Sequence, residues 1–165
     1  KTCGILGSGP IGQAFARRSW ALGMVPVFWD REGRGGEVDI GPARAPRLPL
    51  AHLLARSAVL SIHCPLTQQT RGLLDRAALE QLPGGAVILN TARGGIIDEA
   101  AAIDLLEAGR LGGVGLDVYE GEPKIDPRWL SAPRTVLLPH LGSATVETRA
   151  AMAGLLCDGL AAALG

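Results

Sequence analysis

Short apolar runs alternate along this chain with longer segments in which apolar residues recur every three or four positions. Continuous apolar runs are typical of parallel strands buried on both faces, and the longer period is typical of helices packed on such a sheet. Strands are predicted at residues 3–7, 25–30, 58–64, 86–91, 113–118 and 135–140. Helices are predicted at residues 11–22, 50–56, 75–82, 98–108 and 144–164. The alternation predicts an α/β fold with a doubly wound parallel sheet of six strands, in three layers.

Two segments stand apart from this alternation. Residues 33–49 are rich in Gly, Pro and Arg, which predicts a loop. The helix predicted at 144–164 is amphipathic and is expected either to pack into the core or to cross to another domain. Its broad apolar face is formed by Val146, Met152, Leu155, Leu156 and Leu160.

Composition and charge narrow the functional classes. The chain has 165 residues, is 47% hydrophobic, and balances 16 basic against 16 acidic residues. Such a balance argues against a nucleic-acid or anionic-membrane partner, because both need a basic field. The apolar runs are too short to span a bilayer, and we expect no signal peptide. Three widely spaced cysteines resemble reduced thiols, so we expect a cytoplasmic location and no disulfide or metal site.

The segment between the first predicted strand and helix has the pattern G-x-G-x-x-G, with glycines at Gly7, Gly9 and Gly12. The first glycine permits a tight turn, the second lets the backbone approach a pyrophosphate, and the third lets helix and strand pack closely. Pro10 and Ile11 open the helix, whose first amides would face the phosphates. This arrangement predicts a dinucleotide site.

An acid, Asp30, ends the second predicted strand 18 positions after Gly12. A carboxylate there accepts hydrogen bonds from ribose hydroxyls and repels a 2′-phosphate, which favours NAD(H) over NADP(H). Arg31 and Arg34 follow and would soften this preference by pairing with a phosphate.

Three charged or titratable side chains follow the ends of later strands: Arg93 the fourth, Glu122 the fifth and His140 the sixth. In a doubly wound sheet these carboxyl ends meet at the edge where ligands bind. Arginine forks onto a carboxylate, which suits an acidic substrate. Histidine exchanges a proton near neutral pH, and a neighbouring carboxylate favours its protonated form. The set therefore predicts reduction of a carbonyl, with His140 giving the proton.

The motifs GSGPIG, HCPLTQQTRGLL, NTARGGIIDE, GLDVYEGEP and PHLGSAT occur in this order along the chain. Together they make the sequence similar to the D-isomer-specific 2-hydroxyacid dehydrogenases, from residue 1 to about 149. The resemblance implies a Rossmann fold that binds NAD and acts on small 2-keto or D-2-hydroxy acids, glyoxylate or hydroxypyruvate above all.

The resemblance also implies residue roles, which agree with the reasoning from charge and position. Arg93 matches the substrate-carboxylate anchor, Glu122 the assisting carboxylate and His140 the acid/base. The residues that match cofactor-binding positions are Pro10 and Ile11 at the pyrophosphate, Cys64 and Pro65 over the adenosine side, Thr91 and Ala92 near the nicotinamide ribose, and Asp117, His140, Gly142 and Ser143 along the nicotinamide end. Arg31, beside Asp30, is added to this set.

Members of that family also carry a second, flavodoxin-like substrate domain, which residues 1–165 do not contain. We therefore expect one dinucleotide-binding domain that binds NAD(H), turns over poorly alone, and forms a homodimer. Three alternatives stay open. A formate or phosphite dehydrogenase fits the fold, a corepressor-type module would sense NAD(H) without chemistry, and an adenosylmethionine-binding domain would leave Arg93 and His140 unexplained.

Overall fold

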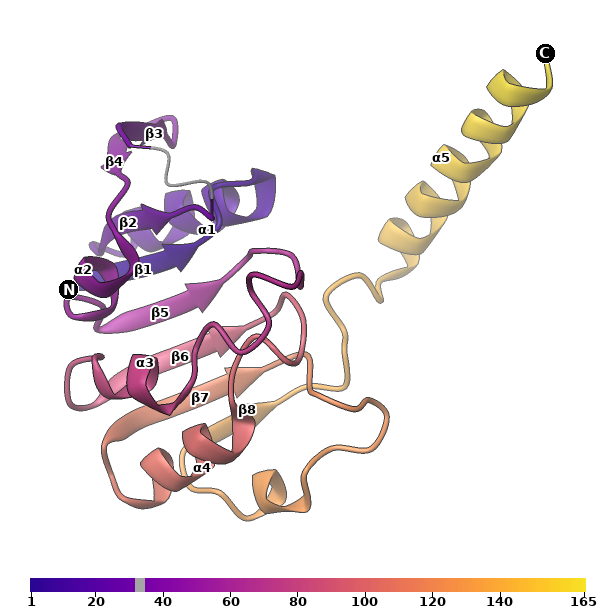
Figure 1. The fold of residues 1–165 in the computed structure, drawn as a ribbon. Coiled ribbons are helices and arrows are strands. Elements are labelled where there is room, and N and C mark those ends of the chain that lie inside the picture. Colours follow the sequence, from indigo (N-terminus) through magenta and orange to yellow (C-terminus); the bar gives the residue numbers. More distant parts are fainter. Residues whose placement is uncertain (32–34) are drawn as a thin grey trace.

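The computed structural model describes residues 1–31 and 35–165. Within these residues, six parallel strands form one sheet in the order β2-β1-β5-β6-β7-β8 (Figure 1). Their bounds are β1 Thr2–Leu6, β2 Val25–Trp29, β5 Val59–Ile62, β6 Ala86–Asn90, β7 Leu111–Leu116 and β8 Thr135–Leu137. The predicted doubly wound parallel sheet is confirmed. The strands predicted at 58–64, 113–118 and 135–140 end earlier than expected, because their last residues leave the sheet and build loops at its carboxyl edge.

A small antiparallel hairpin occupies part of the segment predicted as loop. It consists of β3 (Glu37–Asp39) and β4 (Arg44–Pro46), so the loop prediction for 33–49 is wrong there. Val38 and Ala45 are buried against Phe28, which gives these three-residue strands a core face despite their Gly- and Pro-rich surroundings. A parallel bridge between Phe28 and Arg47 then places the end of β4 beside β2.

The direction in which the sheet grows reverses next to β1. From β1 the chain adds β2 and then the end of β4 on one side, and it crosses over to place β5 on the other side. The connection that follows β1 and the connection that follows β5 therefore leave the sheet on opposite sides. A crevice opens at such a switch point, and ligands of open α/β sheets bind there.

Two apolar clusters on opposite faces of the sheet give the three layers. Helix α1 (Pro10–Ala21) covers β1 and β2, where Ala16 packs with Ile5 and Phe28. The helical segments α2 (Leu50–Leu54), α3 (Arg76–Glu80), α4 (Glu99–Glu107) and the 3₁₀ helix η1 (Pro127–Leu130) contribute to the other cluster. Their core residues there are Leu53, Leu54, Ala78, Leu79, Ala101, Ala102, Ile103, Leu105, Leu106 and Trp129. Asp75 and Asp98 cap α3 and α4 by accepting a backbone amide in each first turn.

Helix α5 (Val146–Leu164) extends away from the body of the molecule, and none of its residues is buried (Figure 1). The expectation that its apolar face packs into the core is therefore wrong in this structure. The extended segment after β8 carries the helix off the sheet, and sequence periodicity indicates an apolar face without indicating what covers it. That this helix crosses to another domain stays a prediction.

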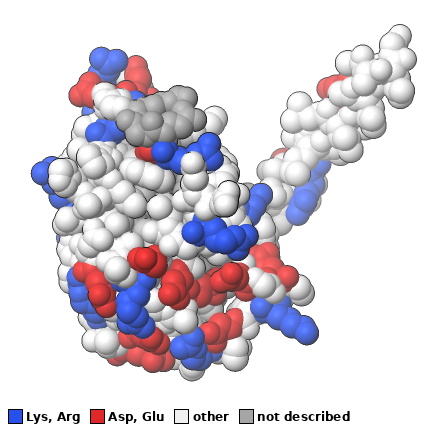
Figure 2. Space-filling view, viewed as in Figure 1, with Lys and Arg blue, Asp and Glu red and all other residues white. Residues whose placement is uncertain are grey.

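Charges are mixed over the surface. Figure 2 shows acidic and basic side chains interspersed on the face in view, whereas α5 carries few. In the part of the chain that the structure describes, no helix combines the length and hydrophobicity needed to span a membrane.

Candidate nucleotide-binding and catalytic site

The three glycines of the turn after β1 have different surroundings. Gly7 has a φ of 104°, and a Cβ there would lie 2.9 Å from the backbone of His63. A Cβ on Gly12 would lie 2.0 Å from the carbonyl oxygen of Gly7. In contrast, a Cβ on Gly9 would meet no atom within 4 Å. The first and third glycines therefore permit close packing, and the second leaves backbone open to a ligand.

The first turn of α1 faces this opening. Gly9 is its N-cap residue, no side chain caps the helix, and Pro10 occupies the first helical position. Pro10 and Ile11 are exposed there, and Gln13 donates from Nε2 to the Ser8 carbonyl at 2.8 Å. An uncapped helix N-terminus presents amide donors and a partial positive charge, both suited to phosphate.

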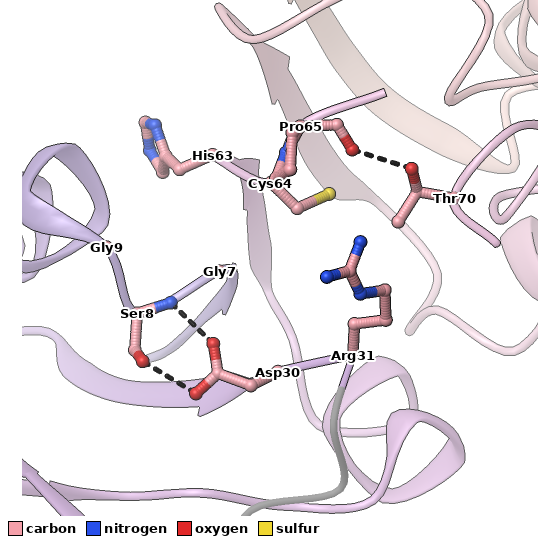
Figure 3. Close-up of a pocket in the computed structure, with 9 residues that line it drawn as sticks. All are labelled: Gly7, Ser8, Gly9, Asp30, Arg31, His63, Cys64, Pro65 and Thr70. Atoms are coloured by element: carbon pink, nitrogen blue, oxygen red, sulfur yellow. Dashed lines mark hydrogen bonds between the residues drawn. The ribbon is translucent and has the colours of Figure 1, made fainter. Parts of the chain in front are cut away.

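A pocket of about 300 Å³ opens at the switch point, between the ends of β1, β2 and β5 (Figure 3). Its lining residues are Gly7, Ser8, Gly9, Asp30, Arg31, His63, Cys64, Pro65 and Thr70. Six of these were predicted as cofactor-binding residues, and the structure brings them together. Ser8 and Thr70 were missed as lining residues, although both lie within motifs that the sequence shows.

Asp30 is held by a dense set of donors. Its Oδ1 accepts from the Ser8 amide at 2.7 Å, and its Oδ2 accepts from Ser8 Oγ at 2.6 Å and from Arg47 Nε at 2.7 Å. Burial alone would raise the pKa of Asp30, but the hydrogen bonds from Ser8 and Arg47 outweigh burial and hold the pKa below its ordinary value. The carboxylate is thus ionised and fixed in direction.

The opposite wall of the pocket is formed by the loop after β5. Figure 3 shows the guanidinium of Arg31 pointing toward Cys64. Burial raises the pKa of the Cys64 thiol to about 11, so it lines the pocket as a neutral group. Thr70 Oγ1 donates to the Pro65 carbonyl at 2.6 Å and fixes the loop. Arg34, the other predicted phosphate partner, lies outside the described residues.

A second hollow, of about 330 Å³, lies over the sheet and is lined in part by Thr91 and Asp117. His63 also lines it, with Nε2 2.8 Å from Ser61 Oγ and its ring centroid 5.1 Å from that of Phe15. Burial lowers the pKa of His63 to about 4, which leaves this imidazole neutral near pH 7.

Asp117 is buried and anchors the segment after β8. Its Oδ1 accepts from the Leu141 amide at 2.6 Å, and its Oδ2 accepts from the Gly142 amide at 2.8 Å. A Cβ on Gly142 would lie 3.1 Å from Oδ2, so a glycine suits this close approach. These bonds fix the backbone between His140 and Ser143, which explains why an apolar strand is followed at once by an acid.

Glu122 and His140 meet at the carboxyl edge of the sheet, as the sequence predicted. Glu122 Oε2 lies 2.8 Å from His140 Nδ1, and its Oε1 accepts from the Tyr119 amide at 2.8 Å. The bond with His140, followed by that from Tyr119, lowers the pKa of Glu122. His140 has a φ of 57°, an uncommon conformation for a non-glycine residue that occurs at functional sites. Both side chains line a hollow of about 390 Å³.

Arg93 lies on the turn after β6, and buried Asn90 holds that turn. Asn90 Oδ1 accepts from the Ala92 amide at 3.1 Å, and its Nδ2 donates to the Arg93 carbonyl at 2.9 Å. A Cβ on Gly94 would lie 1.9 Å from the Tyr119 carbonyl, so this turn packs against the loop that leads to Glu122. Arg93 is exposed, and its charge contributes to lowering the pKa of Glu122. Asn90 was missed, although a polar residue ending an apolar strand is a usable signal.

The glycine turn, the open helix N-terminus and the acid after β2 define a dinucleotide-binding domain of the Rossmann type. Residues 1–142 match the family model described as D-isomer specific 2-hydroxyacid dehydrogenase, NAD binding domain. The chain belongs to this family. The described residues hold no cluster of three or more His, Cys, Asp or Glu side chains suited to a metal ion.

Known proteins of this family resemble the chain over nearly all its length. A glyoxylate reductase of Thermococcus litoralis is 38% identical over 163 residues, which are 98% of this chain and 48% of that protein. The crystal structure of a glyoxylate reductase from Paecilomyes thermophila matches with a TM-score of 0.90 and 41% identity, covering 99% of this chain and 49% of that one. An NADPH-dependent glyoxylate/hydroxypyruvate reductase from Sinorhizobium meliloti, in complex with NADP and malonate, matches with a TM-score of 0.89 and 36% identity, covering 98% and 49%. The chain thus spans about half the length of these relatives.

Proposed function

We propose that this chain is the NAD(H)-binding domain of an oxidoreductase acting on a small 2-keto or D-2-hydroxy acid, such as glyoxylate or hydroxypyruvate. The observation that carries the proposal is the 2.8 Å contact between His140 and Glu122, at the same sheet edge as the glycine turn. An imidazole and a carboxylate paired in this way favour an enzyme over a binding domain without chemistry.

The described residues fit a dinucleotide. Open space at Gly9 and the uncapped start of α1 suit the pyrophosphate, and Asp30 in the pocket suits the adenosine ribose. Thr91 and Asp117, which line the hollow over the sheet, suit the nicotinamide end. NAD(H), when bound, supplies or accepts the hydride.

The chain's own residues divide the remaining tasks. Arg93 carries a permanent cation that binds the substrate carboxylate and so orients the carbonyl. His140 gives a proton to the carbonyl oxygen in reduction and takes it back in oxidation. Glu122 fixes the imidazole through Nδ1 and leaves Nε2 for the substrate.

A preference for NAD(H) over NADP(H) is part of the proposal. Asp30 is ionised, which favours ribose hydroxyls over a 2′-phosphate. The relative from Sinorhizobium meliloti is described as NADPH-dependent, so both cofactors are used by proteins of this fold.

We also propose that catalysis needs a separate substrate domain, that the assembled protein is a homodimer, and that it acts in the cytoplasm. The first point is supported by the length of the relatives, of which this chain covers about half. The other two rest on the family resemblance and on the reduced thiols.

The experiment is a domain exchange. This chain replaces the nucleotide-binding half of the Thermococcus litoralis glyoxylate reductase, and NADH oxidation is followed at 340 nm with glyoxylate and hydroxypyruvate. We expect turnover in the chimera and very slow turnover by the chain alone. His140→Ala should lower kcat by about 10²- to 10⁴-fold, and His52→Ala, on the exposed side of α2, should not.

Glu122→Gln refines the test. Glutamine keeps one oxygen to accept the Tyr119 amide, so the loop is retained while the negative charge is removed. We expect kcat to fall by about tenfold or more with little change in NADH affinity. A chimera that binds NADH but keeps its turnover after His140→Ala would contradict the assigned acid/base. NADH binding with no turnover in any chimera would favour the sensor alternative.

A further inference from the structure

We infer that Arg47 determines how strongly this site discriminates between NAD(H) and NADP(H), by partly neutralising Asp30. The inference rests on the proposed function, because it concerns the same nucleotide site. Arg47 follows the hairpin strand β4 and is distant in sequence from the glycine turn and from Asp30. It acts through Asp30 and is therefore a positioning residue.

Arg47 forms hydrogen bonds with two residues of the pocket wall. Its Nε donates to Asp30 Oδ2 at 2.7 Å, its Nη2 to Ser8 Oγ at 3.2 Å, and its Nη1 to the Glu37 carbonyl at 3.0 Å. Asp30 and Ser8 both line the pocket. The side chains of Arg47 and Asp30 are each only 17% exposed, so this ion pair is better shielded from solvent than the other ion pairs found among the described residues. The bridge between Phe28 and Arg47 fixes the backbone that presents the guanidinium.

Pairing changes what Asp30 can do. Two carboxylate oxygens offer about four acceptor positions, and Ser8 and Arg47 already fill three of them. One position is left for a ribose hydroxyl. Asp30, Arg31 and Arg47 together carry a formal charge of +1, whereas Asp30 and Arg31 without Arg47 would carry no net charge. The repulsion of a 2′-phosphate that an acid normally provides is therefore weakened here.

Arg47 is not among the residues that line the pocket, but it contacts two that are, Asp30 and Ser8. A group that hydrogen-bonds Asp30 from the pocket is separated from the guanidinium by the width of one carboxylate. If Asp30 were replaced by a neutral residue, the guanidinium of Arg47 would lose its carboxylate partner and would be able to bind a 2′-phosphate instead. The geometry thus predicts that Asp30 and Arg47 oppose each other in cofactor choice, and that the NAD(H) preference of the native chain is modest.

The first test compares nucleotide affinities. NADH and NADPH are titrated separately into the purified chain and its variants, followed by tryptophan fluorescence, since Trp29 ends β2 beside Asp30. Arg47→Met should weaken NADPH binding about tenfold more than NADH binding, because a 2′-phosphate carries more than one negative charge. Arg47→Lys keeps the charge and should keep the ratio of the two dissociation constants.

Arg44→Met is the matched control. Arg44 lies on the same hairpin, is exposed, and pairs with Glu37 at 3.8 Å, so its loss removes a nearby cation without touching Asp30. We expect no more than about a twofold change in the ratio, as for other exposed charges. An equal change in Arg44→Met and Arg47→Met would contradict the inference and indicate a diffuse field.

A second variant keeps Arg47 in place and protects the test against misfolding of Arg47→Met. Asp30→Asn should strengthen NADPH binding, and the added Arg47→Met should abolish that gain. A gain that persists in the double variant, or no gain in Asp30→Asn, overturns the inference. If Arg47→Met binds NADH and the ratio of the NADH and NADPH dissociation constants is unchanged, the inference alone is overturned. If the native chain binds neither nucleotide, the proposed function and the inference are overturned together.

Discussion

Two glycines of one turn should respond in opposite ways to the same added methyl group. A Cβ on Gly12 would lie 2.0 Å from the Gly7 carbonyl oxygen, whereas a Cβ on Gly9 would meet no atom within 4 Å. Gly9 has φ −66° and ψ 178°, which alanine adopts freely. We therefore expect Gly12→Ala to damage folding and Gly9→Ala to damage nucleotide binding only.

The magnitudes follow from the geometry. An ordinary contact needs more than 1 Å of extra separation at Gly12, and the obstacle is backbone, so α1 must move off β1 at a cost of about 2–4 kcal/mol. For a domain of this size that corresponds to a fall in Tm of roughly 5–15 °C. Gly9→Ala exchanges one N-cap residue for another and should cost about 1 kcal/mol or less.

The assay is thermal unfolding by circular dichroism, followed by an NADH titration of each variant at a temperature where it is folded. Gly9→Ala should lower Tm by no more than about 4 °C. It should lose NADH affinity by about tenfold or more, because its methyl occupies the approach to the pyrophosphate. A Gly9→Ala variant that binds NADH as tightly as the native chain would refute the role given to this turn. A native-like Tm for Gly12→Ala would refute the packing argument.

Two further outcomes test groups that burial perturbs. The pKa of His63 is about 4 in the folded chain and 6.5 in the unfolded chain, so the unfolded chain binds the proton first as the pH falls. The contribution of His63 to the free energy of unfolding is therefore fully present above pH 6.5 and declines toward pH 4. Because His63 is partly exposed, urea unfolding should show that His63→Gln removes about 1–2 kcal/mol of the stability that is lost between pH 7 and 4.5. If His63→Gln leaves the pH dependence of the free energy of unfolding unchanged, the burial of the His63 imidazole is refuted. At pH 8 a chromogenic disulfide reagent should react quickly with exposed Cys157 and slowly with buried Cys3 and Cys64. Burial raises the pKa of both buried thiols to about 11. Fast labelling of Cys64 would contradict this expectation.

Periodicity and glycine spacing were enough to predict the sheet and the placement of most site residues. The reason is physical: the sheet buries short, continuous apolar runs, and parallel strands bring their carboxyl ends to one edge. Arg93, Glu122 and His140 therefore follow strands that are neighbours in space. The 2.8 Å contact of Glu122 with His140 is a consequence of that topology.

Features that depend on contacts between distant segments were not predictable. The hairpin of β3 and β4 is only three residues deep on each side, too short for a periodic signal, and its composition favours turns. Arg47 therefore had no visible link to Asp30. The exposed position of α5 was missed for the converse reason, since an apolar face indicates burial without identifying a partner.

Titration with NADH and, separately, with adenosylmethionine, followed by tryptophan fluorescence, tests whether this chain is a dinucleotide-binding domain. We expect saturable NADH binding that Gly9→Ala weakens by about tenfold or more, with no response to adenosylmethionine. Binding of adenosylmethionine without NADH, or binding of neither by folded protein, would contradict this expectation.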